Sequence, residues 1–124
     1  MVDYRSPKPE AKVRFLPPLP SNFMNKQQKR LDNWFKKNKW EYWQPMSILA
    51  RLIEETGEFA RLVNHVYGDK KKRSDETKQD FEEEIGDILY TLTCFSNSRK
   101  ISLDKALSKS IDKVAKRDKG RFTK

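Results

Sequence analysis

Cysteine and histidine are almost absent from this 124-residue sequence, which contains one of each. The lone Cys94 cannot form an internal disulfide, so we expect a chain that works in a reducing compartment. Cys94 also lies inside the apolar stretch 88–95. This position predicts a core side chain rather than a nucleophile.

Long apolar runs are absent as well. No stretch approaches the roughly 18 consecutive apolar residues that indicate a membrane span, and no apolar segment follows the N-terminus as in a secretory signal. Asp3 and Glu10 argue against an organellar targeting peptide. We therefore predict neither a membrane protein nor a secreted one, and we expect a cytoplasmic protein of one domain.

Proline is scarce except near the N-terminus, where residues 1–24 hold five of the six prolines together with basic residues. Proline lacks a backbone N–H group and fixes φ, which disfavours helices and sheets. We therefore predict a flexible, basic, proline-rich arm over residues 1–24. As an alternative, residues 15–20 could form polyproline II and dock on the chain's own fold or on a partner.

Charge is plentiful and mostly positive, with 27 basic residues against 18 acidic ones and a formal net charge of +9. Residues 99–124 alone hold ten basic residues and three acidic ones. Polyanions are therefore expected partners. One interpretation of this charge is a basic helical module that binds nucleic acid without catalysis, and such binding would weaken steeply with salt.

Apolar side chains recur at helical intervals in four segments, which predicts an all-α fold. The predicted helices cover residues 25–37, 45–67 and 79–96, and a fourth begins at Ser102. Pro45 suits the first position of a helix, and Gly68 suits a helix end because glycine can adopt positive φ. Ser102 is a good N-cap. The polar run 69–78 is a predicted loop.

Two acidic clusters interrupt these apolar patterns. Glu55 and Glu58 are three residues apart on the second predicted helix, with Glu54 at the edge of their face, and Glu84 and Asp87 repeat the spacing on the third. Packed side by side, the two helices would gather four carboxylates. Such a group is costly unless a cation lies among it. The alternative interpretation is the solvated face of an amphipathic helix.

The type of cation follows from the donor atoms. No cysteine or histidine accompanies the acids, so the ligation would be all-oxygen, which suits Mg²⁺ or Mn²⁺ rather than Zn²⁺. Magnesium also takes phosphate oxygens as ligands, which favours a phosphorylated substrate. Gly57 and Gly86 lie in the middle of the two clusters at a cost of about 0.5–1 kcal/mol each, and close helix approach beside a ligand would explain both.

The two acidic clusters follow a fixed pattern, which is Glu54-Glu55-x-x-Glu58, then 25 intervening residues, then Glu84-x-x-Asp87. This pattern resembles the EExxE…ExxD signature of the MazG-like nucleoside triphosphate pyrophosphohydrolases. The resemblance implies one helical domain over residues 25–122, followed by a short tail at 123–124. It implies a four-helix-bundle-like fold completed in a homodimer or homotetramer. It also implies Mg²⁺-dependent conversion of an NTP or dNTP to its monophosphate and pyrophosphate, in a nucleotide-pool house-cleaning role.

The same resemblance assigns roles to residues. Metal ligation falls to Glu55, Glu58, Glu84 and Asp87. Glu54 would orient or deprotonate the attacking water, or alternatively act as a further ligand or support one. Basic residues at four-residue spacing would contact the phosphates, namely Lys113, Arg117 and Arg121, although Val114 and Asp118 depart from the family's pattern there. Aromatic, amide and imidazole side chains would contact the base or sugar, namely Trp40, Trp43, Asn64, His65 and Tyr90.

Overall fold

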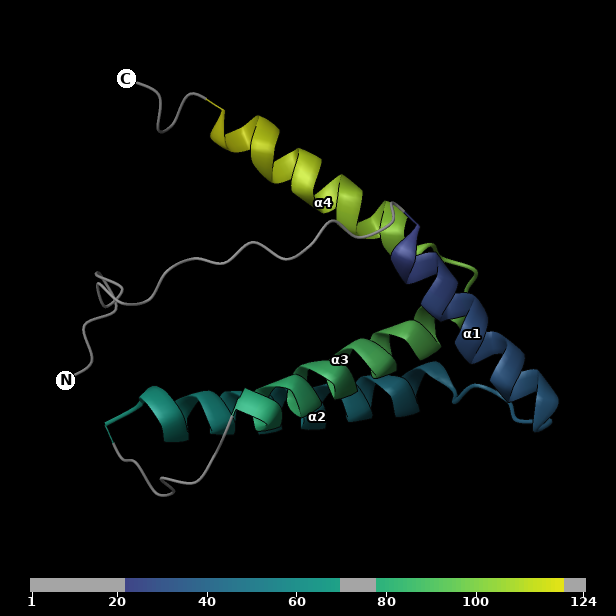
Figure 1. The fold of residues 1–124 in the computed structure, drawn as a ribbon, viewed down its shortest axis with the longest axis horizontal. Helices are drawn as coiled ribbons and strands as arrows, with labels where there is room; N and C mark the ends of the chain where they lie inside the picture. Colours follow the sequence, from purple (N-terminus) through teal and green to yellow (C-terminus); the bar gives the residue numbers. More distant parts are fainter. Residues whose placement is uncertain (1–21, 70–77, 120–124) are drawn as a thin grey trace. The chain divides into compact units, whose positions relative to one another are not determined.

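The computed structural model describes residues 22–69 and 78–119, and every regular element in these ranges is an α-helix (Figure 1). The helices are α1 (Phe23–Lys37), α2 (Pro45–Tyr67), α3 (Lys78–Ser98) and α4 (Leu103–Asp118). The predicted all-α class with four helices is confirmed. None of the helices in the described part of the chain is long and apolar enough to cross a membrane.

Several predicted segments lie outside the described residues. They are residues 1–21 of the arm, residues 70–77 of the loop, and the tail at 123–124. The last two residues of the predicted arm, Phe23 and Met24, already belong to α1.

The described residues form two compact units, and α3 contributes to both. The first unit holds the described residues from Gln44 to Leu92, which are α2 and most of α3. The second unit holds α1, the segment that follows it through Trp43, the end of α3 from Thr93, and α4.

In the first unit, α2 begins and ends at its predicted residues. Pro45 occupies the first helical position, where its missing N–H group costs nothing. The helix stops at Gly68, whose N–H group donates to the backbone oxygen of Asn64 at 2.8 Å. The predicted reason for this stop was wrong, because Gly68 has φ of −80° and not a positive value. Glycine is needed there for space, since a Cβ atom would collide with the carbonyl and side-chain oxygens of Asn64.

The packed side of α2 follows a seven-residue spacing. Ile48 and Leu62 are buried, and Glu55 lies between them on the same face. At the C-terminal end of α2, the rings of Tyr67 and Phe81 lie 6.0 Å apart and join α2 to α3. Burial of an aliphatic side chain such as Ile48 or Leu62 contributes about 1.5–3 kcal/mol. Glu55 therefore lies on the packed face of α2, between two buried aliphatic side chains.

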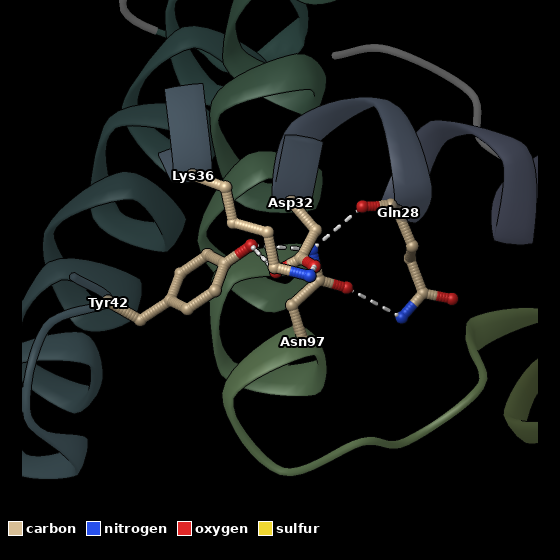
Figure 2. A network of polar contacts seen from close by, with 5 residues as sticks. All are labelled: Gln28, Asp32, Lys36, Tyr42 and Asn97. Atoms are coloured by element: carbon tan, nitrogen blue, oxygen red, sulfur yellow. Dashed lines mark hydrogen bonds and ion pairs between the residues drawn. The ribbon is translucent and has the colours of Figure 1, made fainter. Parts of the chain in front are cut away.

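The second unit is built on an aromatic cluster and a network of polar contacts. Phe35 is buried, stacks on Tyr42 with ring centroids 4.5 Å apart, and meets Trp40 edge to face. Figure 2 shows the polar network, in which Asn97 of α3 lies among Gln28, Asp32 and Lys36 of α1 and Tyr42 of the segment that follows α1. These contacts fix α1 against the end of α3.

Two sets of hydrogen bonds hold the start of α4. The Oγ atom of Ser102 accepts a hydrogen bond from the backbone N–H group of Lys105, which confirms the predicted N-cap. Asp104 accepts hydrogen bonds from the backbone N–H groups of Met24 and Asn25, so its carboxylate caps the N-terminus of α1. The first turn of α4 is thereby tied to the first turn of α1.

The buried apolar core of the described residues is small. It consists of Phe35, Ile48, Leu62 and Cys94, and the burial of Cys94 agrees with its interpretation as a core side chain. The expected close approach at the two helical glycines is not found among the described residues, because a Cβ atom at Gly57 or Gly86 would meet nothing within 4 Å beyond its own helix backbone and chain neighbours. Large apolar side chains are exposed on all four helices instead.

Candidate metal centre

Four carboxylates converge where α2 and α3 lie side by side in the first unit. Glu55 and Glu58 come from α2, and Glu84 and Asp87 come from α3. One oxygen of each side chain can be chosen so that all four lie within 4.8 Å of one another. The three-residue spacing on each helix places both members of a pair on the facing side.

The four carboxylates differ in exposure. Glu55 is buried, Glu84 and Asp87 are half-buried, and Glu58 is exposed. Oε2 of Glu55 and Oε2 of Glu84 are buried and accept no hydrogen bond from the described residues. Buried carboxylate oxygens without partners cost free energy, so the site is poorly satisfied by protein groups alone.

Burial and the crowding of the four carboxylates raise the pKa of Glu84. Burial raises the pKa of its carboxyl above the ordinary value, and the charge of Glu58 is the next cause. A hydrogen bond with Glu58 and the charges of Asp87 and Glu55 raise the Glu84 pKa further. Two carboxyl groups can share a hydrogen bond only when one of them holds a proton. In the metal-free cluster, burial and neighbouring carboxylates therefore favour protonation of Glu84. A bound cation would supply positive charge in place of that proton.

The donor set fits a hard divalent cation. All four candidate ligands are carboxylates, two of their buried oxygens lack hydrogen bonds, and no thiol or imidazole belongs to the group. Oxygen donors of this kind suit Mg²⁺ or Mn²⁺.

Two residues near the cluster were missed by sequence reasoning. The Nε atom of Arg51 donates a hydrogen bond to Oε1 of Glu55 at 2.9 Å. The hydroxyl of the buried Thr91 donates to the backbone oxygen of Asp87, also at 2.9 Å. Arg51 precedes Glu55 by four residues, so an opposite charge one helical turn away was the available signal. The Thr91 contact is visible only in the structure.

The remaining candidates fall into three groups. Glu54 is exposed on α2 and is not among the four converging carboxylates. Lys113 and Arg117 are exposed on α4 in the second unit, where Arg117 pairs with Asp118, and Arg121 lies outside the described residues.

The base and sugar candidates are divided between the two units. Asn64, His65 and Tyr90 belong to the first unit, where His65 is buried and the other two are exposed. Trp40 and Trp43 belong to the second, and both are about half exposed. Trp40 also meets Trp34 edge to face at 4.8 Å, so part of its surface is committed to the aromatic cluster. The structure thus gathers the carboxylates within the first unit, whereas the described phosphate and base candidates are divided between the two units.

A cluster of carboxylates carried by two adjacent helices, with oxygen donors only, suits a hard cation that also takes phosphate oxygens as ligands. The family model for the MazG nucleotide pyrophosphohydrolase domain matches residues 44–122. The chain belongs to this family, which confirms the resemblance read from its acidic motifs, and it is a pyrophosphohydrolase.

Relatives and solved structures agree with this assignment. Protein YpjD of Bacillus subtilis is 44% identical over 97 residues, covering 78% of this chain and 87% of the relative. A crystal structure of YpjD, described as that of a candidate pyrophosphatase, matches with 42% identity and a TM-score of 0.64, over 77% of this chain and 95% of the other. A crystal structure of a Bacillus-conserved MazG protein, described as a nucleotide pyrophosphohydrolase, matches with 38% identity and a TM-score of 0.64, over 77% and 93%.

Proposed function

We propose that this protein hydrolyses a nucleoside triphosphate, NTP or dNTP, to the nucleoside monophosphate and pyrophosphate, using Mg²⁺ held by Glu55, Glu58, Glu84 and Asp87. The observation that carries the proposal is the convergence of these four carboxylates within 4.8 Å. Mn²⁺ would suit the same oxygen donors. Membership of the MazG family supports the reaction type. The domain that performs it would comprise residues 25–122.

In the proposed reaction, water attacks the α-phosphorus, and the bond from that phosphorus to the pyrophosphate oxygen breaks. The cation, when bound, neutralises phosphate charge and lowers the pKa of water. Glu54 is next in sequence to Glu55 and outside the converging group, and we assign it to orient or deprotonate the attacking water. The alternative role is a further metal ligand or a group that supports one.

The basic residues of the C-terminal segment would neutralise the substrate's phosphates. Lys113 and Arg117 are exposed on α4, and we retain Arg121 as the third member of the set. For the base and sugar we retain Trp40, Trp43, Asn64, His65 and Tyr90. A flat indole surface suits stacking on a base, and a side-chain amide suits reading its edge.

Exposed apolar side chains support an oligomer. On α2, Met46, Leu49 and Ile53 are 74%, 46% and 64% exposed, and on α3, Ile85 and Leu89 are 45% and 44% exposed. An apolar stripe on each helix of the first unit, in a chain with so small a core, favours a second copy that covers them. We propose a homodimer or homotetramer that completes the helical bundle, acting in the cytoplasm to clear unwanted nucleotides.

The deciding experiment is pyrophosphate release from a panel of NTPs and dNTPs, with Mg²⁺ and with EDTA. The native chain should release pyrophosphate only with Mg²⁺, and Glu58→Gln should abolish the release. Glu82→Gln is the matched control, because it removes one exposed carboxylate of α3 outside the cluster. Undiminished activity of Glu58→Gln would refute the metal assignment.

The alternative of a basic nucleic-acid-binding module without catalysis explains the net charge of +9. It leaves the four converging carboxylates without a role, although gathering them is costly. Binding that falls steeply with salt, is independent of Mg²⁺ and is accompanied by no pyrophosphate release across the panel would favour this alternative.

A further inference from the structure

Arg51 lies one helical turn before Glu55 on α2 and contacts the acidic cluster. Its Nε atom donates a hydrogen bond to Oε1 of Glu55 at 2.9 Å. The side chain of Arg51 is 45% exposed, whereas that of Glu55 is 8% exposed. The guanidinium group therefore stands at the solvent edge of the cluster and reaches a carboxylate that lies inside it.

The two oxygens of Glu55 have different surroundings. Oε1 is held by Arg51, whereas Oε2 is buried and accepts no hydrogen bond from the described residues. The last torsion of a glutamate side chain has a broad preference, so a carboxylate without a partner turns easily. The hydrogen bond from Arg51 restricts this rotation, and Oε2 is the Glu55 oxygen that has no hydrogen-bond partner among the described residues.

We propose that Arg51 is a positioning residue of the cation site, which holds Oε1 of Glu55 so that Oε2 is presented to the cation. This inference rests on the proposed function of the carboxylate cluster. Groups that orient metal ligands commonly change metal affinity 10- to 100-fold when they are removed. As a plain ion pair at helical spacing, half exposed to water, the contact would matter little for the fold.

The direction in which cation affinity changes when Arg51 is replaced separates a positioning role from a simple effect of its charge. Removal of a positive charge beside four carboxylates would by itself make the site more negative and tighten cation binding. Loss of positioning would weaken it. A variant at Arg51 that binds the cation less tightly therefore cannot be explained by the lost charge.

The experiment is a titration of the metal-free full chain with Mn²⁺, without nucleotide, in which electron paramagnetic resonance measures free Mn²⁺. We expect Arg51→Met to bind Mn²⁺ about 10- to 100-fold more weakly than the native chain. Arg51→Lys, which keeps a donor for Oε1, should recover part of the affinity. Arg30→Met is the matched control, because it removes an exposed arginine of the second unit and should bind as the native chain does.

Native or tighter affinity in Arg51→Met would overturn the inference, and so would an Arg51→Lys variant no better than Arg51→Met. Circular dichroism should show the same helix content in all variants, which separates a binding defect from misfolding. Glu58→Gln distinguishes failure of the proposed cation site from failure of the positioning role of Arg51. If Mn²⁺ binding by the native chain does not depend on Glu58, the cation site itself fails; if it depends on Glu58 but not on Arg51, only the positioning role fails.

Discussion

Gln28 and Asn97 exchange hydrogen bonds through their side chains and backbone. Nε2 of Gln28 donates to Oδ1 of Asn97 at 3.0 Å, and Nδ2 of Asn97 donates to the backbone oxygen of Gln28 at 2.9 Å. Gln28 also bonds the backbone of Ile101 and Leu103, where α3 turns into α4. Figure 2 shows the exchange between Gln28 and Asn97, and the further bonds of the buried Gln28 amide extend this link to the start of α4.

Asn97→Ala should therefore destabilise the fold. The substitution removes one of the two acceptors of the buried Gln28 Nε2, which keeps only its bond to the Ile101 backbone oxygen. It also removes the hydrogen bond from Asn97 to the Tyr42 hydroxyl. The expected cost is about 1–3 kcal/mol. The free energy of unfolding, from urea titration followed by circular dichroism, should fall by that amount. Ser98→Ala is the control, because the exposed Ser98 hydroxyl bonds only within its own helix turn. Equal midpoints for the two variants would show that the amide exchange contributes nothing.

Tyr42 should titrate unusually late. Burial raises the pKa of its hydroxyl from 10.0 to about 12, and the hydrogen bond and charge of Asp32 act in the same direction. The fold thus favours the neutral phenol. This contribution to stability is fully present below pH 10 and is lost as pH rises through about 12. Absorbance of tyrosinate near 295 nm should show one late transition.

Tyr42→Phe identifies the residue behind that transition. The variant should lack the late phase. A late phase of undiminished amplitude in Tyr42→Phe would assign the raised pKa to another tyrosine.

The helices were predictable because their signals are local. Apolar spacing, Pro45 and the cap at Ser102 act within one or two turns, and the structure keeps each of them. Gly68 was predicted for the wrong reason, since local sequence does not reveal the crowding by Asn64. The exchange between Gln28 and Asn97 joins residues 69 positions apart, and no periodicity pairs such positions.

The four carboxylates of the candidate site were predictable for the same reason, because their spacing on each helix is local. The spacing on α2 and on α3 fixes which carboxylates share a face, and the packing of the two faces then brings Glu58 near Glu84. The residues proposed for phosphate and base contacts are divided between the two units, and Arg117 and Trp40 belong to the second. Helical spacing does not determine how such side chains converge, so those assignments remain predictions.

Glu84→Gln should stabilise the metal-free chain near neutral pH. The Glu84 pKa is raised by burial and by neighbouring carboxylates, so the charged form is disfavoured in the fold. The native chain is therefore expected to lose stability as pH rises from about 4.5 through the raised Glu84 pKa, and the glutamine variant should lack this loss. Thermal unfolding in EDTA at several pH values measures the difference. Identical pH profiles for the two chains would contradict it.

Mg²⁺ should stabilise the native chain more than the Glu84→Gln variant. The native chain should gain thermal stability with Mg²⁺, because a ligand that binds only the folded state stabilises it. Glu84→Gln should gain less, since it lacks one of the four carboxylates. An equal gain would remove Glu84 from the proposed ligand set.

Ile53→Glu should weaken self-association. Ile53 is 64% exposed on α2, and we propose that a second copy of the chain covers it. A charge placed in an apolar contact loses its hydration without gaining a partner. Sedimentation at micromolar concentration should show the native chain as a dimer or tetramer and the variant shifted toward monomer. Ile53→Met keeps an apolar side chain of similar volume and should associate as the native chain does. A native chain that sediments only as a monomer would refute the oligomer, and the exposed stripes of α2 and α3 would then face solvent.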